Sequence, residues 1–554
     1  MSELTGPAGP ARTAMSPSSD PVSRQGTGTN RRGFLAGLAT VAGALAVPVD
    51  LLRPRRASAA TYDYTARETF DPFDRVFHSS GAAGQPDQPN DHGGLAWGQS
   101  YVLMGFMRMY DAYRDTYYLD RLIHNVDLVL ANRDSVRGVT DYTGRSLPAW
   151  RAMHPYTVGT VRLTDGRGRE VLEVRSARAY ADETTVTVRS GSGDGRVTLE
   201  VVSPRYGVDT FPDVTMDPAS SDYVVRRVYD AYPGPAMTTV RDLRADPADR
   251  TDPPRLGTFA LSSQPVVFSV HTGMITYPIA TFVRVVATTP TLRRNSRYKA
   301  KAEEYLAAVE AAVAVHDSEW REDDGAGYFR WPKGMPVPYD GTIQPINQSV
   351  ALGRTYLELA RVTRDPHYLR RAQALATMVR AQLVVDSGGA YIWPYWPTFS
   401  EVYQGYGKSG DPATDVSEYT PSYGSASGGA QQYEDLSHAA IEVDFAALAF
   451  RAGVVFKGLD MVRLARTFTQ NLATSADGLA TTYVRVDGGG GLAPPGQYLQ
   501  APRWMAVAPW DPALFTHALA IYVDHDVQPG SGSGVACVAN LNWYARRFAN
   551  QTPS

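Results

Sequence analysis

The stretch INQSVALGRTYLELARVTRDPHYLRRAQALATMVRAQL, residues 346–383, shows the pattern from which the fold can be predicted. Apolar residues recur at a spacing of three to four in both halves, which is the period of an α-helix. The first half is apolar on nearly every side and the second is more amphipathic, so we expect a buried helix followed by one that faces water. The short break between the halves makes the stretch a helical hairpin.

Units of the same kind recur along the chain. Further copies begin near residues 93, 271 and 438, and a shorter pair of helices follows residue 511. Hairpins with a buried inner helix and a half-exposed outer helix can close into a ring. The spacing between copies exceeds that of common helical repeats, and the extra length lies in loops, which suits an enzyme better than a scaffold. The sequence therefore predicts a mainly α fold, an (α/α) toroid of helical hairpins.

Residues 157–262 have a different composition. Apolar and polar residues alternate there, as in ETTVTVRS at 183–190, and the turns carry Asp-Gly and Gly-Asp pairs. This pattern is typical of short strands. We expect an inserted all-β, sandwich-like domain that separates a first toroid hairpin, residues 60–156, from the remaining hairpins, residues 263–554. Such a domain either binds a ligand or braces the ring, and bracing is the simpler expectation.

Residues 1–59 are predicted to be a leader. The first 28 residues are rich in Pro, Ser, Thr and Gly, which is typical of disorder. Arg31 and Arg32 then precede an apolar run of signal-peptide length, and Ala-Ser-Ala at 57–59 is a small-residue cleavage site. The pattern is that of a twin-arginine (Tat) signal. We expect export by the Tat machinery, cleavage near Ala59, and a secreted or extracytoplasmic protein.

Charge and cysteine content narrow the possible functions. The net charge is −3, and the leader is more basic than the rest of the chain, which argues against a nucleic-acid partner. Cys537 is the only cysteine, so neither a disulfide within the chain nor a thiolate zinc site can form. Only 5 of the 54 basic residues are Lys. Coding bias explains this excess of Arg most simply, although Arg also suits carboxylate or phosphate ligands.

Polar groups at the starts of the predicted inner helices form a candidate site. If these starts lie at one end of a ring, they would surround one central cavity. Helix capping explains the Asp residues equally well, because Asp and Asn favour helix N-termini, but it explains the His residues less well. The set comprises Asp91, His92, His271, Gln344, Asn347, Asp435, His438 and Asp511.

Aromatic residues gather in the same loops, where their flat faces could stack on sugar rings. The motif YIWPYW, residues 391–396, contains a proline and lies in a Gly-rich loop, so we interpret it as a ligand surface rather than as core. The long polar segment that follows, 400–431, is typical of a lid or a disordered loop. The aromatic candidates are Trp393, Trp396, Tyr433 and Trp510.

The most acidic of the helix starts is QQYEDLSHAAIEVDF, residues 431–445. On a helix that begins near Asp435, the side chains of Asp435, His438 and Glu442 fall on one stripe. Three interpretations compete: His438 is a general acid or base tuned by Asp435 or Glu442, the stripe is a buried polar network that fixes helix register, or it is a metal site. No second His-rich cluster supports the metal interpretation, so we expect no metal and no cofactor.

The hairpin repeat, the EDLSHA helix start at 434–439, the PINQSVALG helix at 345–353 and the YIWPYW loop resemble carbohydrate-active (α/α) toroids. That superfamily includes six-hairpin glycosidases, polysaccharide lyases and the C-terminal domain of D-glucuronyl C5-epimerases, and the epimerase likeness is the nearest. The resemblance implies a uronic-acid polysaccharide as substrate and removal of the proton next to the sugar carboxylate. It also implies roles for particular residues: His438 and His271 as bases, Tyr277 and Tyr433 as proton donors, and Asn347 or Gln344 as groups that hold the carboxylate.

Two other functions stay open. A glycoside hydrolase needs two carboxylates across the scissile bond, and Asp435 or Glu434 facing Asp91 or Asp511 would supply them. A non-catalytic glycan-binding ring would use the aromatic residues alone.

Overall fold

The computed structural model describes residues 61–246, 252–424 and 430–549. The predicted leader and its cleavage site lie outside these residues. The described residues are mainly helical, as predicted, and they also form sheets. None of the described helices is both long and apolar enough to cross a membrane.

Six elements of the helical part contact one another in a closed circuit. Each of α2, α6, α9 and α12 packs against the next, α12 packs against the 3₁₀ helix η8, η8 against α16, and α16 against α2. Every side chain from Ile346 to Leu359 in α9 is buried, as expected for a helix that is apolar on nearly every side. The six elements are α2 (Ser100–Tyr113), α6 (Ser269–Thr288), α9 (Ile346–Thr363), α12 (Leu436–Arg451), η8 (Ala501–Ala506) and α16 (Gly532–Tyr544).

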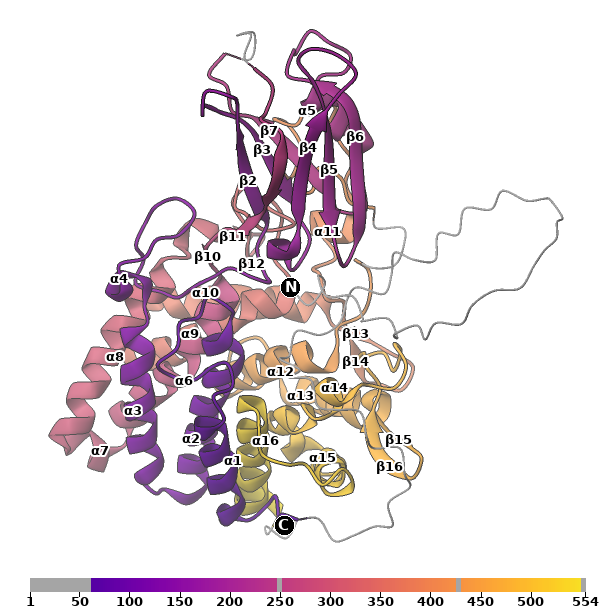
Figure 1. Cartoon of the computed structure of the whole chain (residues 1–554). Coiled ribbons are helices and arrows are strands. Elements are labelled where there is room, and N and C mark those ends of the chain that lie inside the picture. Colours follow the sequence, from indigo (N-terminus) through magenta and orange to yellow (C-terminus); the bar gives the residue numbers. More distant parts are fainter. Residues whose placement is uncertain (1–60, 247–251, 425–429, 550–554) are drawn as a thin grey trace.

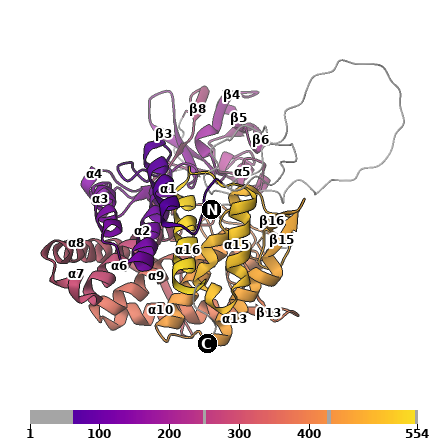
Figure 2. The same ribbon diagram turned by 90° about the horizontal axis from the view of Figure 1, so that it is seen from below.

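A second helix packs against each element of this circuit. α3 packs on α2, α8 on α6, α10 on α9, α13 on α12, α15 on η8, and α1 on α16. Figures 1 and 2 both show α3 and α8 on the outer side of α2 and α6. The outer helices are α1 (Arg67–Ser79), α3 (Tyr117–Ala131), α8 (Ser296–Ala314), α10 (Pro366–Gln382), α13 (Gly458–Arg466) and α15 (Ala513–Asp524).

The last pair of helices is reversed relative to the prediction. The sequence pattern placed the helix after Asp511 on the inside, but α15 is only half buried, whereas α16 is buried along its whole length. In addition, α1 has no counterpart among the predicted hairpins. Its residues Phe70, Phe73 and Phe77 are buried at helical spacing, and the helix packs on α16. The first and last described helices therefore complete the helical part together.

The helices α6 and α9 approach each other closely at Gly273. A Cβ atom on residue 273 would lie 2.3 Å from the carbonyl carbon of Ala351 and 2.4 Å from the backbone nitrogen of Leu352. One turn further along, the buried hydroxyls of Thr276 and Thr355 are hydrogen-bonded at 2.9 Å. Only a residue without a Cβ atom allows this backbone approach, so Gly273 sets the spacing of the two helices.

The β part consists of two four-stranded antiparallel sheets that face each other, beside the helical part in Figure 1. Leu172 and Val174 of one sheet share a buried cluster with Val186 and Leu199 of the other. A helix, α5 (Val224–Ala231), packs on β6 and β7, so the insertion is not purely β. In spatial order the sheets are β7 (Thr238–Asp242), β3 (Glu170–Ser176), β2 (Gly159–Thr164) and β9 (Ser262–Ser263), and β6 (Gly207–Thr215), β5 (Arg196–Ser203), β4 (Thr185–Ser190) and β8 (Gly257–Ala260).

Several contacts hold the β part on the helical part, among them the following two. The segments by which the chain enters and leaves the β part are paired, because β1 (Arg151–Ala152) and β10 (Val266–Val267) form a short antiparallel ladder. Lys408 Nζ donates to the carbonyl oxygens of Tyr229 at 2.7 Å and Tyr232 at 3.1 Å. The described portion of the segment predicted to be a lid or a disordered loop thus packs against the β part.

Shorter elements complete the described chain. They are the hairpins β11 (Trp320–Asp323) with β12 (Ala326–Phe329), β13 (Val384–Val385) with β14 (Tyr391–Ile392), and β15 (Ala473–Ala476) with β16 (Leu479–Thr482), and the helices α4 (Asp134–Arg137), α7 (Pro290–Arg294), α11 (Glu401–Gln404) and α14 (Pro495–Tyr498). All three hairpins follow outer helices and lie in the loops between helical pairs.

We expect Gly273→Ala to lower the free energy of unfolding by about 1–3 kcal/mol, because the new methyl group would push two buried backbones apart. Urea denaturation measures the change. Gly458→Ala is the matched control, since nothing lies within 4 Å of its Cβ position at the start of α13, and it should change the free energy by less than about 0.5 kcal/mol. Equal effects of the two substitutions would contradict the role assigned to Gly273.

Candidate functional site

The segment that leads into α12 is held extended between two loops. The backbone nitrogen of Glu434 donates to the carbonyl of Trp393 at 2.9 Å, and its carbonyl accepts from Val486 at 3.0 Å. Next along the chain, the nitrogen of Leu436 donates to the carbonyl of Val484 at 2.9 Å. Hydrogen bonds on both sides therefore fix the positions from which Glu434 and Asp435 project.

Asp435 caps α12 and also binds His438. Its Oδ1 accepts the backbone N–H groups of Ser437 at 2.8 Å and His438 at 3.0 Å, which is the geometry of an N-cap. Its Oδ2 lies 2.6 Å from Nδ1 of His438. The side chains of His438 and Asp435 are 16% and 10% exposed. Because Asp435 occupies Nδ1, the opposite ring nitrogen, Nε2, is the one suited to exchange a proton with a ligand.

Glu434 and Glu442 form a buried carboxyl pair next to Asp435. Both side chains are almost completely buried, and their carboxyl groups are hydrogen-bonded to each other. Glu434 Oε1 also accepts the backbone N–H of Asp435 at 2.7 Å, and Glu442 Oε2 accepts the indole N–H of Trp393. The second oxygen of each group, Glu434 Oε2 and Glu442 Oε1, has no other donor within the described residues. A proton held between the two carboxyls satisfies both oxygens.

The surroundings shift the pKa values of these carboxyl groups in opposite directions. Burial raises the pKa of Glu442 to about 8. Burial and repulsion from Glu442 and Asp435 raise the pKa of Glu434 well above its usual range. Burial also opposes ionisation of Asp435, but the charge of His438 and several hydrogen bonds outweigh it and hold the pKa of Asp435 far below its usual range. At neutral pH one ionised carboxylate therefore lies beside a protonated pair.

The same residues offer ligands of the kind that hold a divalent cation. Glu434, Asp435 and His438 each present one ligand atom, and these atoms lie within 4.8 Å of one another. Carboxylate oxygen with imidazole nitrogen is a common ligand set for such ions. However, His438 Nδ1 already contacts Asp435 at 2.6 Å, so an ion bound through that nitrogen would have to replace this contact.

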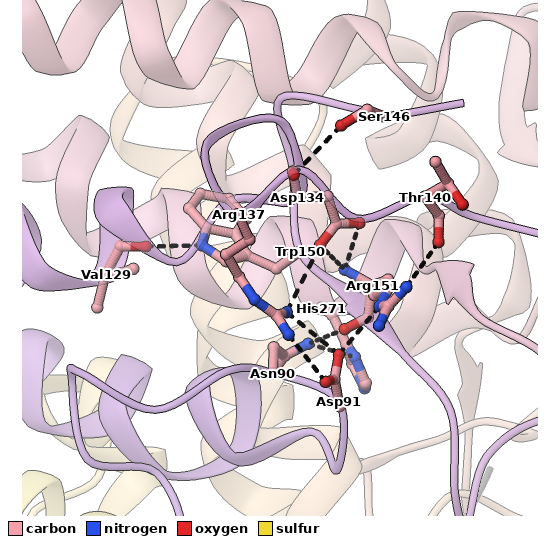
Figure 3. A network of polar contacts seen from close by, with 10 residues as sticks. All are labelled: Asn90, Asp91, Val129, Asp134, Arg137, Thr140, Ser146, Trp150, Arg151 and His271. Carbon is pink, nitrogen blue, oxygen red and sulfur yellow. Dashed lines mark hydrogen bonds and ion pairs between the residues drawn. The ribbon is translucent and has the colours of Figure 1, made fainter. Parts of the chain in front are cut away.

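The predicted candidate Asp91 lies in a separate network at the first hairpin. Figure 3 shows its carboxylate between Arg137 and Arg151, with N–O distances of 3.1 and 3.2 Å. Asp134, fully buried nearby, accepts the backbone N–H of Arg151, and burial raises the pKa of Asp134 to about 7. Both oxygens of Asp91 are bound by Arg side chains, so we interpret this network as a brace for the loop that follows α4.

His271 and Gln344 are fully buried and hydrogen-bonded inside the protein. Trp97 Nε1 donates to His271 Nε2 at 3.0 Å, and burial lowers the pKa of His271 to about 3. Gln344 Nε2 donates to Glu319 at 2.8 Å. Asn347 is also buried, and its side-chain oxygen has no partner among the described residues. The structure does not bring these residues into contact with the Asp435–His438 pair.

His92 and Asp511 also lie apart from that pair. His92 is exposed, with Nδ1 3.1 Å from the carbonyl oxygen of His154. Asp511 precedes the outer helix α15, and Thr469 donates to its Oδ2 at 2.7 Å. Tyr544, at the end of α16, donates to the nearby Ala508 carbonyl, which places Asp511 at the opposite end of the helical part from the start of α12.

The predicted aromatic residues divide by exposure. Trp393 and Trp396 are both 1% exposed, so they pack in the core and offer no face to a sugar, which differs from our interpretation of the YIWPYW loop. Trp510 packs edge-on against Phe450, with ring centroids 5.4 Å apart. Tyr433, adjacent to Glu434, is 36% exposed. It is the predicted aromatic residue that offers a ring to a ligand beside the carboxyl cluster.

A cavity of the helical part lies elsewhere than predicted. It is lined by the middle and C-terminal turns of α2, α6, α9, α12 and α16, and Tyr277 is the one predicted site residue in it. The carboxyl cluster at the start of α12 does not line this cavity. Arg108, Arg354 and Asp444 line the cavity and are not among the predicted site residues. Their signal was a charged residue inside an otherwise apolar helix.

Comparisons with known proteins give little further guidance. No protein-family model matches the chain, and no curated protein sequence matches it. One solved structure that matches is a family 76 glycoside hydrolase from a bovine Bacteroides thetaiotaomicron strain, with 10% sequence identity and a TM-score of 0.22, over 66% of this chain and 100% of that chain. A score this low does not establish a shared fold, so the case for function rests on the site.

Replacing Glu442 with Gln should flatten the pH dependence of the free energy of unfolding. A carboxyl group whose pKa is raised by folding keeps its proton in the folded protein after the unfolded chain has lost it. Its contribution to stability is therefore complete below the usual Glu pKa of 4.5 and is lost as the pH rises towards about 8. Urea denaturation across this interval measures the slope, which should be smaller in Glu442→Gln.

The control for that experiment is Glu303→Gln, because the Glu303 side chain is 69% exposed. Its free energy of unfolding should depend on pH with the same slope as that of the wild-type protein. If Glu442→Gln and Glu303→Gln give the same pH profile, the raised pKa of Glu442 is wrong.

Proposed function

We propose that this protein is a carbohydrate-active enzyme that hydrolyses a glycosidic bond with the groups at the start of α12. The observation that supports the proposal is the opposite shift of neighbouring carboxyl pKa values, with Asp435 ionised and the Glu434–Glu442 pair protonated at neutral pH. Glycoside hydrolysis needs this combination, since one carboxyl gives a proton to the leaving oxygen while a carboxylate assists the attack on carbon.

The exposed edge of the cluster suits a sugar. Asp435 and His438 are less deeply buried than the Glu434–Glu442 pair, and the ring of Tyr433 beside them is available for stacking. In this proposal Asp435 is the carboxylate that meets the substrate. The protonated pair supplies a proton to the leaving oxygen through His438, and the proton that Asp435 takes from the attacking water returns to the pair. This division of roles follows from exposure, because the pair itself is buried.

The charge of the cluster favours hydrolysis over the epimerase or lyase reaction that the sequence resemblance implied. Within the described residues, no Arg or Lys side chain forms an ion pair with Glu434, Asp435 or Glu442, and His438 is their only basic partner. His438 is already paired with Asp435, so the cluster offers no further basic group of the described residues to a sugar carboxylate. A neutral sugar needs no such group, so we propose a neutral glycan as substrate.

The architecture and location are also proposals. The closed circuit of six inner elements, each with an outer helix, supports an (α/α) toroid. The twin-arginine pattern at the N-terminus supports export, which would place the enzyme where extracellular glycans occur.

The test is to incubate the exported protein, without its leader, with neutral polysaccharides and with uronate polymers. We expect new reducing ends from a neutral glycan and no unsaturated uronate product. Asp435→Asn should lower kcat/KM by at least about 100-fold, because it removes the carboxylate that takes part in proton transfer. Asn caps a helix as well as Asp does, so the variant should fold.

Asp365→Asn is the matched control. Asp365 caps α10 by accepting the backbone N–H of His367 at 2.8 Å, and it lies far along the chain from the cluster. The same substitution there should leave kcat/KM unchanged. Hydrolysis that survives in Asp435→Asn, or an unsaturated product from uronate polymers, would overturn the proposal.

A further inference from the structure

The cavity at the C-terminal ends of the circuit helices is strongly basic. It has a volume of about 510 Å³, and eight arginines but only three carboxylates line it. The side chains at its mouth, Arg114, Arg361 and Arg547, are exposed, whereas Arg354 at its floor is buried, with 3% of the side chain exposed. The cavity is therefore reached from solvent and deepens towards the middle of the circuit.

The charges at the floor are incompletely neutralised. Asp444 lies between two guanidinium groups, with Oδ1 3.2 Å from Arg108 Nη2 and Oδ2 3.4 Å from Arg354 Nη1. A single carboxylate therefore forms ion pairs with two guanidinium groups. In addition, Arg354 Nε is buried and has no partner among the described residues. Like charges this close repel one another in a partly dry cavity, and a bound anion would relieve that repulsion.

Aromatic rings hold the arginines at the floor in place. Arg354 lies over the ring of Tyr277 at 4.5 Å, Arg108 over Trp543 at 4.7 Å, and Arg503 over Tyr101 at 4.7 Å. Stacking on a ring fixes the plane of a guanidinium group and leaves N–H groups at its edge, where they can bind an oxyanion. The cavity therefore presents a set of ordered donors.

Helix capping does not explain these residues. Lysine or arginine in the last turn of a helix stabilises its C-terminus. Arg108 and Arg354, however, lie in the interior of α2 and α9. A charged residue in a buried helix interior costs free energy unless it is paired, so its presence needs another reason.

We propose that this cavity binds a small polyanion, a ligand with at least two closely spaced phosphate or carboxylate groups. The volume accommodates a small molecule, and the guanidinium groups match oxyanions in geometry as well as charge. The proposal does not depend on the carboxyl cluster being catalytic, since that cluster lies on other elements at the opposite end of the circuit.

The test is isothermal titration calorimetry of the protein with inorganic pyrophosphate, with digalacturonate and with acetate, all at one ionic strength. We expect pyrophosphate or digalacturonate to bind and to raise the Tm, and acetate to do neither. Binding of pyrophosphate alone identifies a phosphate ligand, and binding of digalacturonate alone identifies a carboxylate ligand. Absence of binding by both would overturn the proposal.

The double variant Arg361→Gln/Arg547→Gln tests whether the ligand binds in this cavity. Both side chains are exposed at the mouth, so the variant should fold with an unchanged Tm in the absence of ligand, and it should weaken binding by about tenfold or more. The matched control is Arg293→Gln/Arg370→Gln, two exposed arginines on α7 and α10 that do not line the cavity. Equal affinity in the two double variants would overturn the assignment.

Discussion

The helices of the inner circuit have almost no side that faces water, and this constraint determines where their charged groups lie. A buried charge is costly unless it is paired, neutralised or hydrogen-bonded. On α12, Glu442 and Asp444 are two residues apart and so point to nearly opposite sides of the helix. Glu442 meets Trp393 and Glu434, and burial raises its pKa, whereas Asp444 forms ion pairs with Arg108 and Arg354. One helix thereby contributes to two sites of opposite character.

The two sites favour ligands of different charge. At the start of α12, acidic groups dominate, protons are held inside the protein, and one carboxylate with its histidine is less deeply buried. At the far end, arginines dominate and a cavity is open to solvent. A neutral sugar fits the first environment and an anion fits the second. The position of each residue along its helix, rather than its type alone, decides which site it serves.

The repeat around residues 346–383 predicted the helical hairpins well, because a period of three to four identifies a helix from local sequence alone. The order of inner and outer helices failed for α15 and α16, since both are apolar and only long-range contacts with α2 decide which is buried. Asp435, His438 and Glu442 were recognised because they share one helix stripe. The exposure of Trp393 and Trp396 was misjudged, because composition does not show which way a loop faces. The arginine-lined cavity could not be predicted, since Arg108 and Asp444 are 336 residues apart in sequence.

The state of the buried carboxyl pair is the central claim, because both the proposed acid and the pH dependence of stability follow from it. Infrared difference spectroscopy of the wild-type protein against Glu442→Gln at neutral pH tests it most directly. We expect the difference spectrum at neutral pH to contain the C=O stretching band of protonated Glu442, and we expect this band to disappear above about pH 8. A spectrum at neutral pH in which Glu442 contributes only carboxylate bands would contradict the account.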